Sequence, residues 1–231
     1  MPVTGRITGI SSMATRLLLA ELVDDFCRQR DCDVAIESVG GVAAAKRVQA
    51  GEAFDVVVLA SEAIDKLIAS GHVVDGSKVD LVRSGVAVAV RAGSPHPDVT
   101  SEDALRRAVA AARTLSYSTG PSGVHLAKVF AGWGMGETIK SKVLQAPPGV
   151  PVGTLVARGD VELGFQQLSE LLHVDGIDVV GPLPPGVQIV TTFSGAVCSA
   201  SRHVDGARDL LAFMASRGAE SAKRRHGMEP A

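Results

Sequence analysis

Serine, threonine and glycine gather where predicted strands give way to predicted helices, and these residue types suit the binding of an anion. Five such junctions occur, at residues 9–12, 39–41, 60–61, 118–123 and 151–154. Each offers backbone N–H groups with little side-chain bulk, and four of the five also carry a hydroxyl. An anion at a helix N-terminus gains about 0.3–1 kcal/mol from each helix dipole. Because Ser and Thr also cap ordinary helices, one junction indicates only capping, whereas five favour an anion-binding cleft.

The elements that position these junctions alternate between strand and helix. The hydrophobic pattern predicts strands over residues 4–10, 33–39, 54–59, 79–90, 114–118, 141–145, 161–165, 177–180 and 187–199. Helices are expected to begin at Ser11 or Ser12, after Gly40-Gly41, at Ser61, after Thr100-Ser101, near Val124 and near Pro151, with a last helix over 205–225. This alternation predicts an α/β fold. We expect two lobes, one formed by residues 1–83 and 191–231 and the other by residues 84–190.

The composition excludes several classes of protein. Of the 231 residues 46% are hydrophobic and 3% are aromatic, and the formal net charge is −2. The hydrophobic share is enough for a packed core, which excludes a disordered chain. The few aromatic rings and the near-neutral charge disfavour binding to nucleic acid or to anionic lipid. We therefore expect neither partner.

Cysteine, histidine and the N-terminal residues address compartment and cofactors. Cys27, Cys32 and Cys198 are too few for a disulfide framework, and we expect them to be small buried apolar side chains. No secretory signal is visible, and no run of about 18 apolar residues could span a membrane. We expect a cytoplasmic protein, or a periplasmic one if a leader was removed. No metal-ligand spacing and no dinucleotide-binding or Walker pattern occurs, so we expect no metal and no cofactor.

The junctions carry a resemblance to a known family. Gly9-Ile10-Ser11-Ser12 before one helix, Gly40-Gly41 before the next, and the run from Ala45 to Ser61 resemble the first lobe of molybdate-type periplasmic solute-binding proteins. The similarity follows nearly the whole chain. It implies a class II binding-protein fold in which each lobe is a mostly parallel sheet flanked by helices. The ligand is then gripped between the lobes by Ser side chains and backbone amides.

One segment of the second lobe departs from the molybdate pattern. Residues 164–170, with the sequence Gly-Phe-Gln-Gln-Leu-Ser-Glu, stand where a molybdate binder carries a tyrosine. Together with residues 120–125 and 180–184 they resemble the branch of the family that includes aconitate isomerase. That branch implies a small di- or tricarboxylate ligand and an allylic proton shift that moves a C=C bond. Gln amides suit carboxylates because each has two N–H donors, and a tetrahedral oxyanion is the alternative ligand.

The junctions and the resemblance together nominate the ligand-binding residues. They are Ser11, Ser12, Gly40, Gly41, Ser61, Thr119, Ser122, Gly123, Val152, Gln166 and Gln167. A proton shift also needs a base, and the candidates are His125, Lys46, Glu170 and Glu37. Each has a plainer interpretation: a surface histidine, a solvated helix lysine or an exposed glutamate. Helix-end amides and hydroxyls must stabilise the charge that develops on the substrate.

Three functions follow from these observations. The first is an isomerase that acts on a small unsaturated polycarboxylate. The second is a non-enzymatic substrate-binding component of a molybdate, oxyanion or carboxylate transporter. The third is a ligand-sensing module, although no DNA-binding segment accompanies it. We favour the isomerase, and the transporter component is the main alternative.

Overall fold

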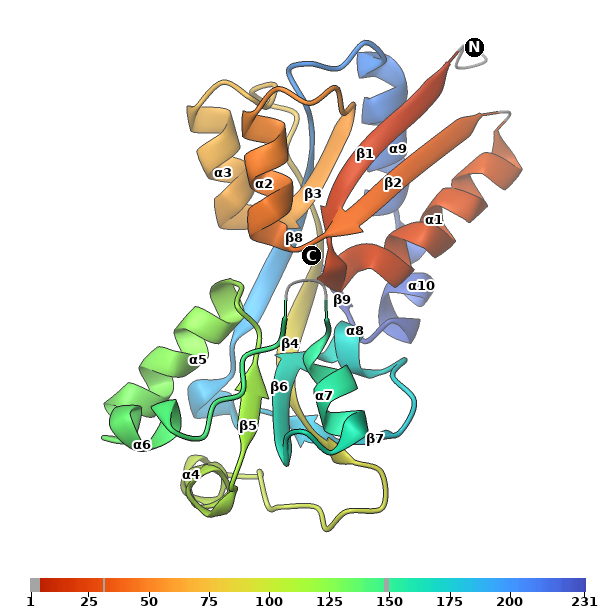
Figure 1. Cartoon of the computed structure of the whole chain (residues 1–231). Helices are drawn as coiled ribbons and strands as arrows, with labels where there is room; N and C mark the ends of the chain where they lie inside the picture. Colours follow the sequence, from red (N-terminus) through yellow and green to blue (C-terminus); the bar gives the residue numbers. More distant parts are fainter. Residues whose placement is uncertain (1–4, 31, 148–149) are drawn as a thin grey trace. The chain divides into compact units, whose positions relative to one another are not determined.

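The computed structural model describes residues 5–30, 32–147 and 150–231, and they form two compact units. The first unit comprises Met1–Arg83 and Thr191–Ala231, and the second comprises Ser84–Val190. The chain passes from the first unit to the second through the long strand β4 (Val79–Arg91) and returns through β8 (Val190–Val197) (Figure 1). Thr4, where the first strand was expected to begin, lies outside the described parts of the chain, and so do Pro148 and Gly149.

The first unit is built on a mixed sheet in the order β2-β1-β3-β8-β4. Strand β1 (Arg6–Ser12) runs parallel to β2 (Asp33–Val39) and to β3 (Val56–Ala60), whereas β8 runs antiparallel to β3. The short β9 (Glu229–Pro230) pairs with β4 in the antiparallel sense. The carboxyl ends of β1, β2 and β3 therefore lie at one edge of the sheet.

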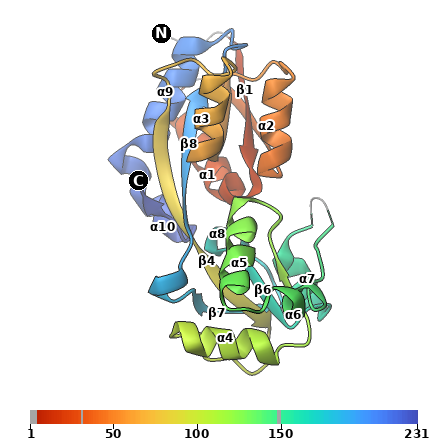
Figure 2. The same cartoon turned by 90° about the vertical axis from the view of Figure 1, so that its left-hand side faces the viewer.

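Alternating side chains of the central strand β3 build a core on each face of this sheet. Val56 and Val58 join the cluster that is covered by α1 (Arg16–Gln29), α9 (Val204–Ala215) and α10 (Glu220–Arg225). Val57 and Leu59 join the cluster under α2 (Gly41–Gln49) and α3 (Ser61–Ala69). The helices α2 and α3 lie side by side (Figure 1 and Figure 2). Two-sided burial explains the continuous apolar sequence of β3.

The second unit has the strand order β5-β6-β4-β7. Strands β5 (Leu115–Tyr117) and β6 (Leu163–Gln167) are parallel, whereas β4 is antiparallel to β6 and to β7 (Ile177–Pro182). The expectation of a mostly parallel sheet is therefore wrong for this unit. The reason is that β4 enters from the first unit and runs opposite to both of its neighbours.

Helices cover both faces of the second sheet as well. They are α4 (Glu102–Ala111), α5 (Pro121–Gly132), α6 (Gly136–Lys140), α7 (Val152–Arg158) and α8 (Leu168–Leu171). Val86 and Val88 of β4 pack in the cluster that contains residues of α4 and α5, and Ala87 and Ala89 contact Leu171 of α8. The prediction of an α/β architecture is confirmed, with mixed rather than mostly parallel sheets.

Several local expectations need correction. The predicted strand over 141–145 is wrong, because only Val143 makes a bridge, to Leu115. The last helix does not run through 205–225: it ends at Ala215, and Ser216 is extended before a 3₁₀ turn (Arg217–Ala219). Ser101 caps α4 as predicted, since its side chain accepts the Ala104 N–H at 3.2 Å. Ser61 does not cap α3, because Ala60 occupies the N-cap position.

The expectations for the cysteines and for membrane-spanning segments can be compared with the structure. Cys198 is buried as expected, but Cys27 and Cys32 are only partly buried. The expectation of small buried side chains is thus wrong for those two. Within the described parts of the chain, no helix has the length and apolar character needed to cross a bilayer.

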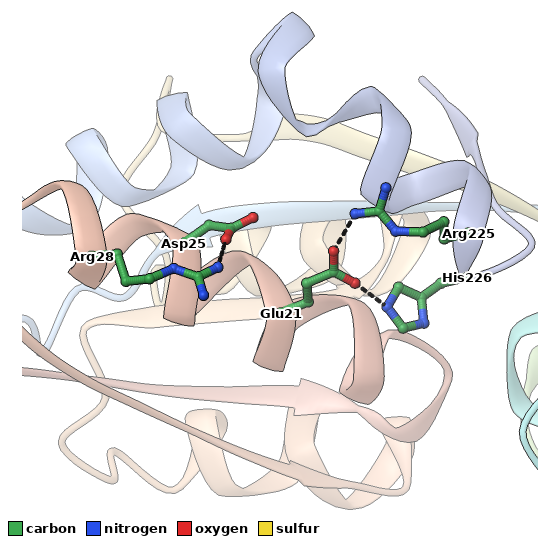
Figure 3. A network of polar contacts seen from close by, with 5 residues as sticks. All are labelled: Glu21, Asp25, Arg28, Arg225 and His226. Atoms are coloured by element: carbon green, nitrogen blue, oxygen red, sulfur yellow. Dashed lines mark hydrogen bonds and ion pairs between the residues drawn. The ribbon is translucent and has the colours of Figure 1, made fainter.

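A polar network joins the C-terminal helix α10 to α1 in the first unit. Figure 3 shows the Glu21 carboxylate bound to both Arg225 and His226, with the His226 Nε2 at 2.8 Å. The hydrogen bond from Arg225 is the largest effect that holds the pKa of Glu21 below its ordinary value. One turn further along α1, Asp25 pairs with Arg28 of the same helix. Of the contacts drawn in Figure 3, those of Glu21 link segments that are distant in sequence, and that of Asp25 does not.

We predict that Glu21→Gln lowers the melting temperature at pH 7 by about 1–4 °C, the equivalent of about 0.5–1 kcal/mol. Because the folded pKa of Glu21 is lowered, this stabilisation is present above pH 4.5, the ordinary value, and is lost as the pH falls through the folded pKa. Thermal melting at several pH values measures it. Asp25→Asn is the control and should change little. An equal effect of both variants, or a loss in Glu21→Gln that stays the same as the pH falls below 4.5, would contradict the prediction.

Candidate functional site

Two serine-bearing strand ends lie side by side in the first unit. Ser11 of β1 is opposite Ser38 of β2 in the parallel register, and their Oγ atoms are 2.8 Å apart. The Ser11 hydroxyl is buried and also lies 3.3 Å from the carbonyl oxygen of Ser12. Both strands stop here, so the two hydroxyls mark the carboxyl edge of the sheet.

Ser12 brings an unused hydroxyl to the start of α2. Its Oγ is one of three buried side-chain nitrogen or oxygen atoms in the described parts of the chain that have no hydrogen-bond partner. A Cβ added to Gly41 would lie 3.6 Å from the Ser12 Cβ, so the first residue of α2 packs against Ser12. The first amides of a helix have no acceptor within the helix. Ser12 and the N-terminus of α2, capped by Gly40, therefore offer hydroxyl and amide donors next to each other.

Other candidates of the first unit lie at the surface. Lys46 is exposed on α2, and Ser61 is partly buried as the first residue of α3. Glu37 forms an ion pair with Arg47 at 2.7 Å. Because a guanidinium already engages its carboxylate, Glu37 is a poor choice for a base.

In the second unit, the parallel strands β5 and β6 bring two more candidate segments together at their carboxyl ends. Tyr117 lies opposite Phe165, so Ser118 follows β5 beside the last residues of β6. The Ser118 Oγ accepts the Gly120 N–H at 3.0 Å, which shapes the entry into α5. A Cβ on Gly123 would lie 1.5 Å from the Ser118 carbonyl oxygen. Only glycine can therefore take that position in this arrangement.

The start of α5 places the remaining candidates of this loop in different environments. Ser122 and Gly123 are buried in the first turn, whereas Thr119 and His125 are exposed. Pro121 is the first helical residue and has no N–H, so the amides of Ser122 and Gly123 are the donors that this helix end offers.

Gln166, at the end of β6, is bound on both sides of its amide group. Its Oε1 accepts the Gly153 N–H of α7 at 3.4 Å, and its Nε2 donates to Glu170 Oε1 at 2.8 Å. The neighbours Val152, on α7, and Gln167, which precedes α8, are buried. Because both atoms of the Gln166 amide are engaged, its first role is to orient Glu170.

Glu170 has the perturbed carboxyl of this cluster. Burial raises the pKa of Glu170 to about 7, and the hydrogen bond from Gln166 offsets only part of that rise. The hydroxyls of Ser169, next in the chain, and of Ser116, in β5, are buried without a partner in the described structure. A carboxyl that titrates near neutral pH can exchange a proton with a C–H acid, and unpaired hydroxyls and helix amides can stabilise the resulting anion.

The structure thus brings the candidates together in two groups, one in each unit. Ser11, Ser12, Gly40 and Gly41 form the first, and Ser122, Gly123, Val152, Gln166, Gln167 and Glu170 belong to the second. Lys46 on α2 and His125 on α5 are exposed, as is Thr119 in the loop before α5, and Ser61 is partly buried at the start of α3. In the described residues no group of three or more His, Cys, Asp or Glu side chains could hold a metal ion.

Sequence reasoning missed Ser38, Ser116 and Ser169. Ser38 and Ser116 lie inside predicted strands, where a hydroxyl gives no signal of its own until the pairing register is known. Ser169 was part of the quoted segment 164–170 but was not selected as a site residue.

We predict that Gly123→Ala destabilises the protein by about 1–3 kcal/mol, because the added methyl group overlaps the Ser118 carbonyl. Thermal melting measures the loss. Gly132→Ala, at the other end of α5, is the matched control, because nothing lies within 4 Å of a Cβ there. The control should melt at or above the temperature of the unmodified protein, and equal melting of both variants would show that the Ser118 contact is not restrictive.

Comparison with known proteins identifies a family and a relative of known activity. The model of the family described as bacterial extracellular solute-binding protein matches residues 7–229. The chain is 43% identical to the aconitate isomerase of a Pseudomonas species over 185 residues, which are 80% of this chain and 70% of that protein. These findings confirm the resemblance inferred from the sequence, including the aconitate isomerase branch.

Solved structures support the fold at low sequence identity. The periplasmic molybdate-binding protein of Azotobacter vinelandii aligns with a TM-score of 0.79 at 18% identity, over 96% of this chain and 98% of that one. The sulfate-binding protein of Mycobacterium tuberculosis aligns with a TM-score of 0.79 at 19% identity, over 98% and 87%. The family and the molybdate-binding relative are extracellular or periplasmic by description, and none of these comparisons supports the cytoplasmic expectation. The chain belongs to the bacterial extracellular solute-binding protein family.

Proposed function

We propose that this protein is an isomerase that moves the C=C bond of a small unsaturated polycarboxylate, aconitate or a close analogue. The observation that carries the proposal is the sequence identity to an aconitate isomerase over most of the chain. The Glu170 carboxyl, with its raised pKa and its hydrogen bond from Gln166, supplies the chemical group that such a reaction needs. Because the family is extracellular by description, we place this activity outside the cytoplasm.

Glu170 is the base in this proposal. As a carboxylate it takes a proton from the methylene carbon of the substrate, and the electron pair of that C–H bond spreads over the three allylic carbons and the adjoining carboxylate. The same proton, or one exchanged with solvent, then returns to the former vinylic carbon, and the double bond has moved. Gln166 holds Glu170 Oε1 at 2.8 Å, which leaves Oε2 for the substrate.

The helix ends supply the anion stabilisation. The amides of Ser122 and Gly123 on α5, in the same unit as Glu170, bind a substrate carboxylate in this proposal. Preorganised donors of this kind stabilise charge that develops in the transition state. The buried hydroxyls of Ser116 and Ser169 are further donors of this unit without a protein partner in the described structure. The first unit offers donors of the same kind, the amides at the start of α2 and the Ser12 hydroxyl.

The direct test is incubation with trans-aconitate in D₂O, followed by NMR of the vinylic and methylene signals. We expect conversion to the cis isomer together with deuterium incorporation at the exchanging carbons. Absence of both across a panel of related unsaturated acids would contradict the proposed isomerase.

We predict that Glu170→Gln lowers kcat by about 10²–10⁴-fold, because it removes the base but keeps the size of the side chain. The affinity for trans-aconitate, measured by calorimetry, should change only a few-fold. His125→Gln is the matched comparison, because His125 is exposed on α5 and was the other candidate base of this unit. Loss of turnover in His125→Gln with activity kept in Glu170→Gln would assign the base to His125 instead.

The pH profile gives an independent prediction. Because Glu170 must be ionised to accept a proton and its pKa is raised to about 7, kcat/KM should rise with pH through about 7. The same midpoint should remain in His125→Gln. A profile that is flat over this range, or a midpoint that moves in His125→Gln, would contradict the role of Glu170.

The second candidate function is ligand binding without chemistry, as a component of a transporter. It is favoured by the family and by the molybdate-binding and sulfate-binding relatives, since helix amides and serine hydroxyls also suit a tetrahedral oxyanion. Calorimetry with molybdate, tungstate and sulfate tests it. Binding at micromolar concentration without isomerisation would favour this function over the isomerase.

A further inference from the structure

Two cysteines meet at the turn between α1 and β2. Cys27 lies in the last turn of α1 and Cys32 lies just before β2, and their Sγ atoms are 3.1 Å apart. Both side chains are partly buried and pack against the core cluster beneath α1. Cys198, the third cysteine of the chain, is fully buried in the cluster on the other face of the sheet. The chain therefore brings one pair of thiols together and keeps the third apart.

The segments on both sides of this turn are anchored. On the helix side, Phe26 is fully buried, and the Arg30 guanidinium lies 4.4 Å above its ring. On the strand side, Asp33 pairs with Arg6 in the parallel register of β1 and β2. A disulfide bond needs the sulfurs about 2.05 Å apart, so the pair must close by only about 1 Å. Side-chain rotation within the anchored turn can supply that movement.

We propose that Cys27 and Cys32 are a redox-sensitive pair that forms an intramolecular disulfide when the protein meets a disulfide oxidant. One thiolate attacks a sulfur of the oxidant, forms a mixed disulfide and releases one thiol. The second cysteine then attacks the mixed disulfide, closes the Cys27–Cys32 bond and releases the second thiol. The two cysteines lose two protons and two electrons, and the oxidant is reduced to two thiols. Extracellular proteins meet such oxidants, and the family is extracellular by description.

The surroundings of the pair affect the rate of the exchange. Burial, and next the hydrogen bond with Cys32, raise the pKa of Cys27 to about 11. Because the thiolate is the attacking species, formation of the disulfide should be faster at alkaline pH.

Alkylation after equilibration with excess oxidised glutathione tests the proposal on the whole chain. The oxidised protein, unfolded and treated with iodoacetamide, should carry one alkyl group, on Cys198, whereas the reduced protein should carry three. Trypsin cleaves after Arg28 and Arg30, so the disulfide should appear as two peptides joined through Cys27 and Cys32. Three alkylated cysteines, stable glutathione adducts on both residues, or a disulfide between two chains would overturn the proposal.

Single variants separate the steps and provide controls. Cys198→Ala should leave formation of the disulfide unchanged. Cys27→Ser and Cys32→Ser should each stop at a glutathione adduct on the remaining cysteine of the pair. A disulfide to Cys198 in either variant would overturn the proposal. Oxidation should also raise the melting temperature of the unmodified protein, and the Cys27→Ser, Cys32→Ser double variant should show no such rise.

Discussion

At the end of β6, the side-chain amide of Gln166 binds both the start of α7 and the Glu170 carboxylate. The oxygen accepts an N–H from the start of α7, and the nitrogen donates to the carboxylate of Glu170. One residue thus joins a strand end, a helix start and a titratable group. The same burial that permits this arrangement raises the pKa of Glu170. A shorter side chain here would leave Glu170 without its orienting hydrogen bond.

The buried hydroxyls without a partner lower the stability of the folded chain. An unpaired buried polar group costs about 1–3 kcal/mol, and native proteins avoid most of them. Ser12 and Ser116 carry such hydroxyls at or near the carboxyl ends of β1 and β5, and Ser169 carries one at the start of α8. Ser12 and Ser169 lie beside helix starts, whereas Ser116 lies within β5. A bound anion that accepts from these hydroxyls would recover the cost.

Sequence patterns predicted the elements better than they predicted the contacts. The continuous apolar run of β3, the capping Ser101 and the glycine-rich junctions all have local causes, and the α/β fold and the family followed from them. The break after Ala215 and the absence of a strand over 141–145 depend on packing and pairing that no local period records. The antiparallel direction of β4 likewise depends on chain path rather than on composition.

In the candidate site, too, the sequence predicted residue types and elements but not the contacts between them. Strand ends rich in Ser, Gly and Gln were visible in the sequence, but the contacts between Ser11 and Ser38, and between Gln166 and Gly153, join residues of different elements. Glu170 and His125 were both candidate bases, but the structure buries Glu170 and leaves His125 exposed. The two cysteines five positions apart gave no signal because only the turn between α1 and β2 brings their sulfurs together.

The central claim is that the start of α5 binds the polycarboxylate from which Glu170 takes a proton. Amide NMR spectra recorded during titration with trans-aconitate test it most directly. Signals of Ser122 to Val124 and of Glu170 should shift along one common saturation curve. Unchanged signals at the start of α5, or shifts centred on residues away from it and from Glu170, would contradict the claim.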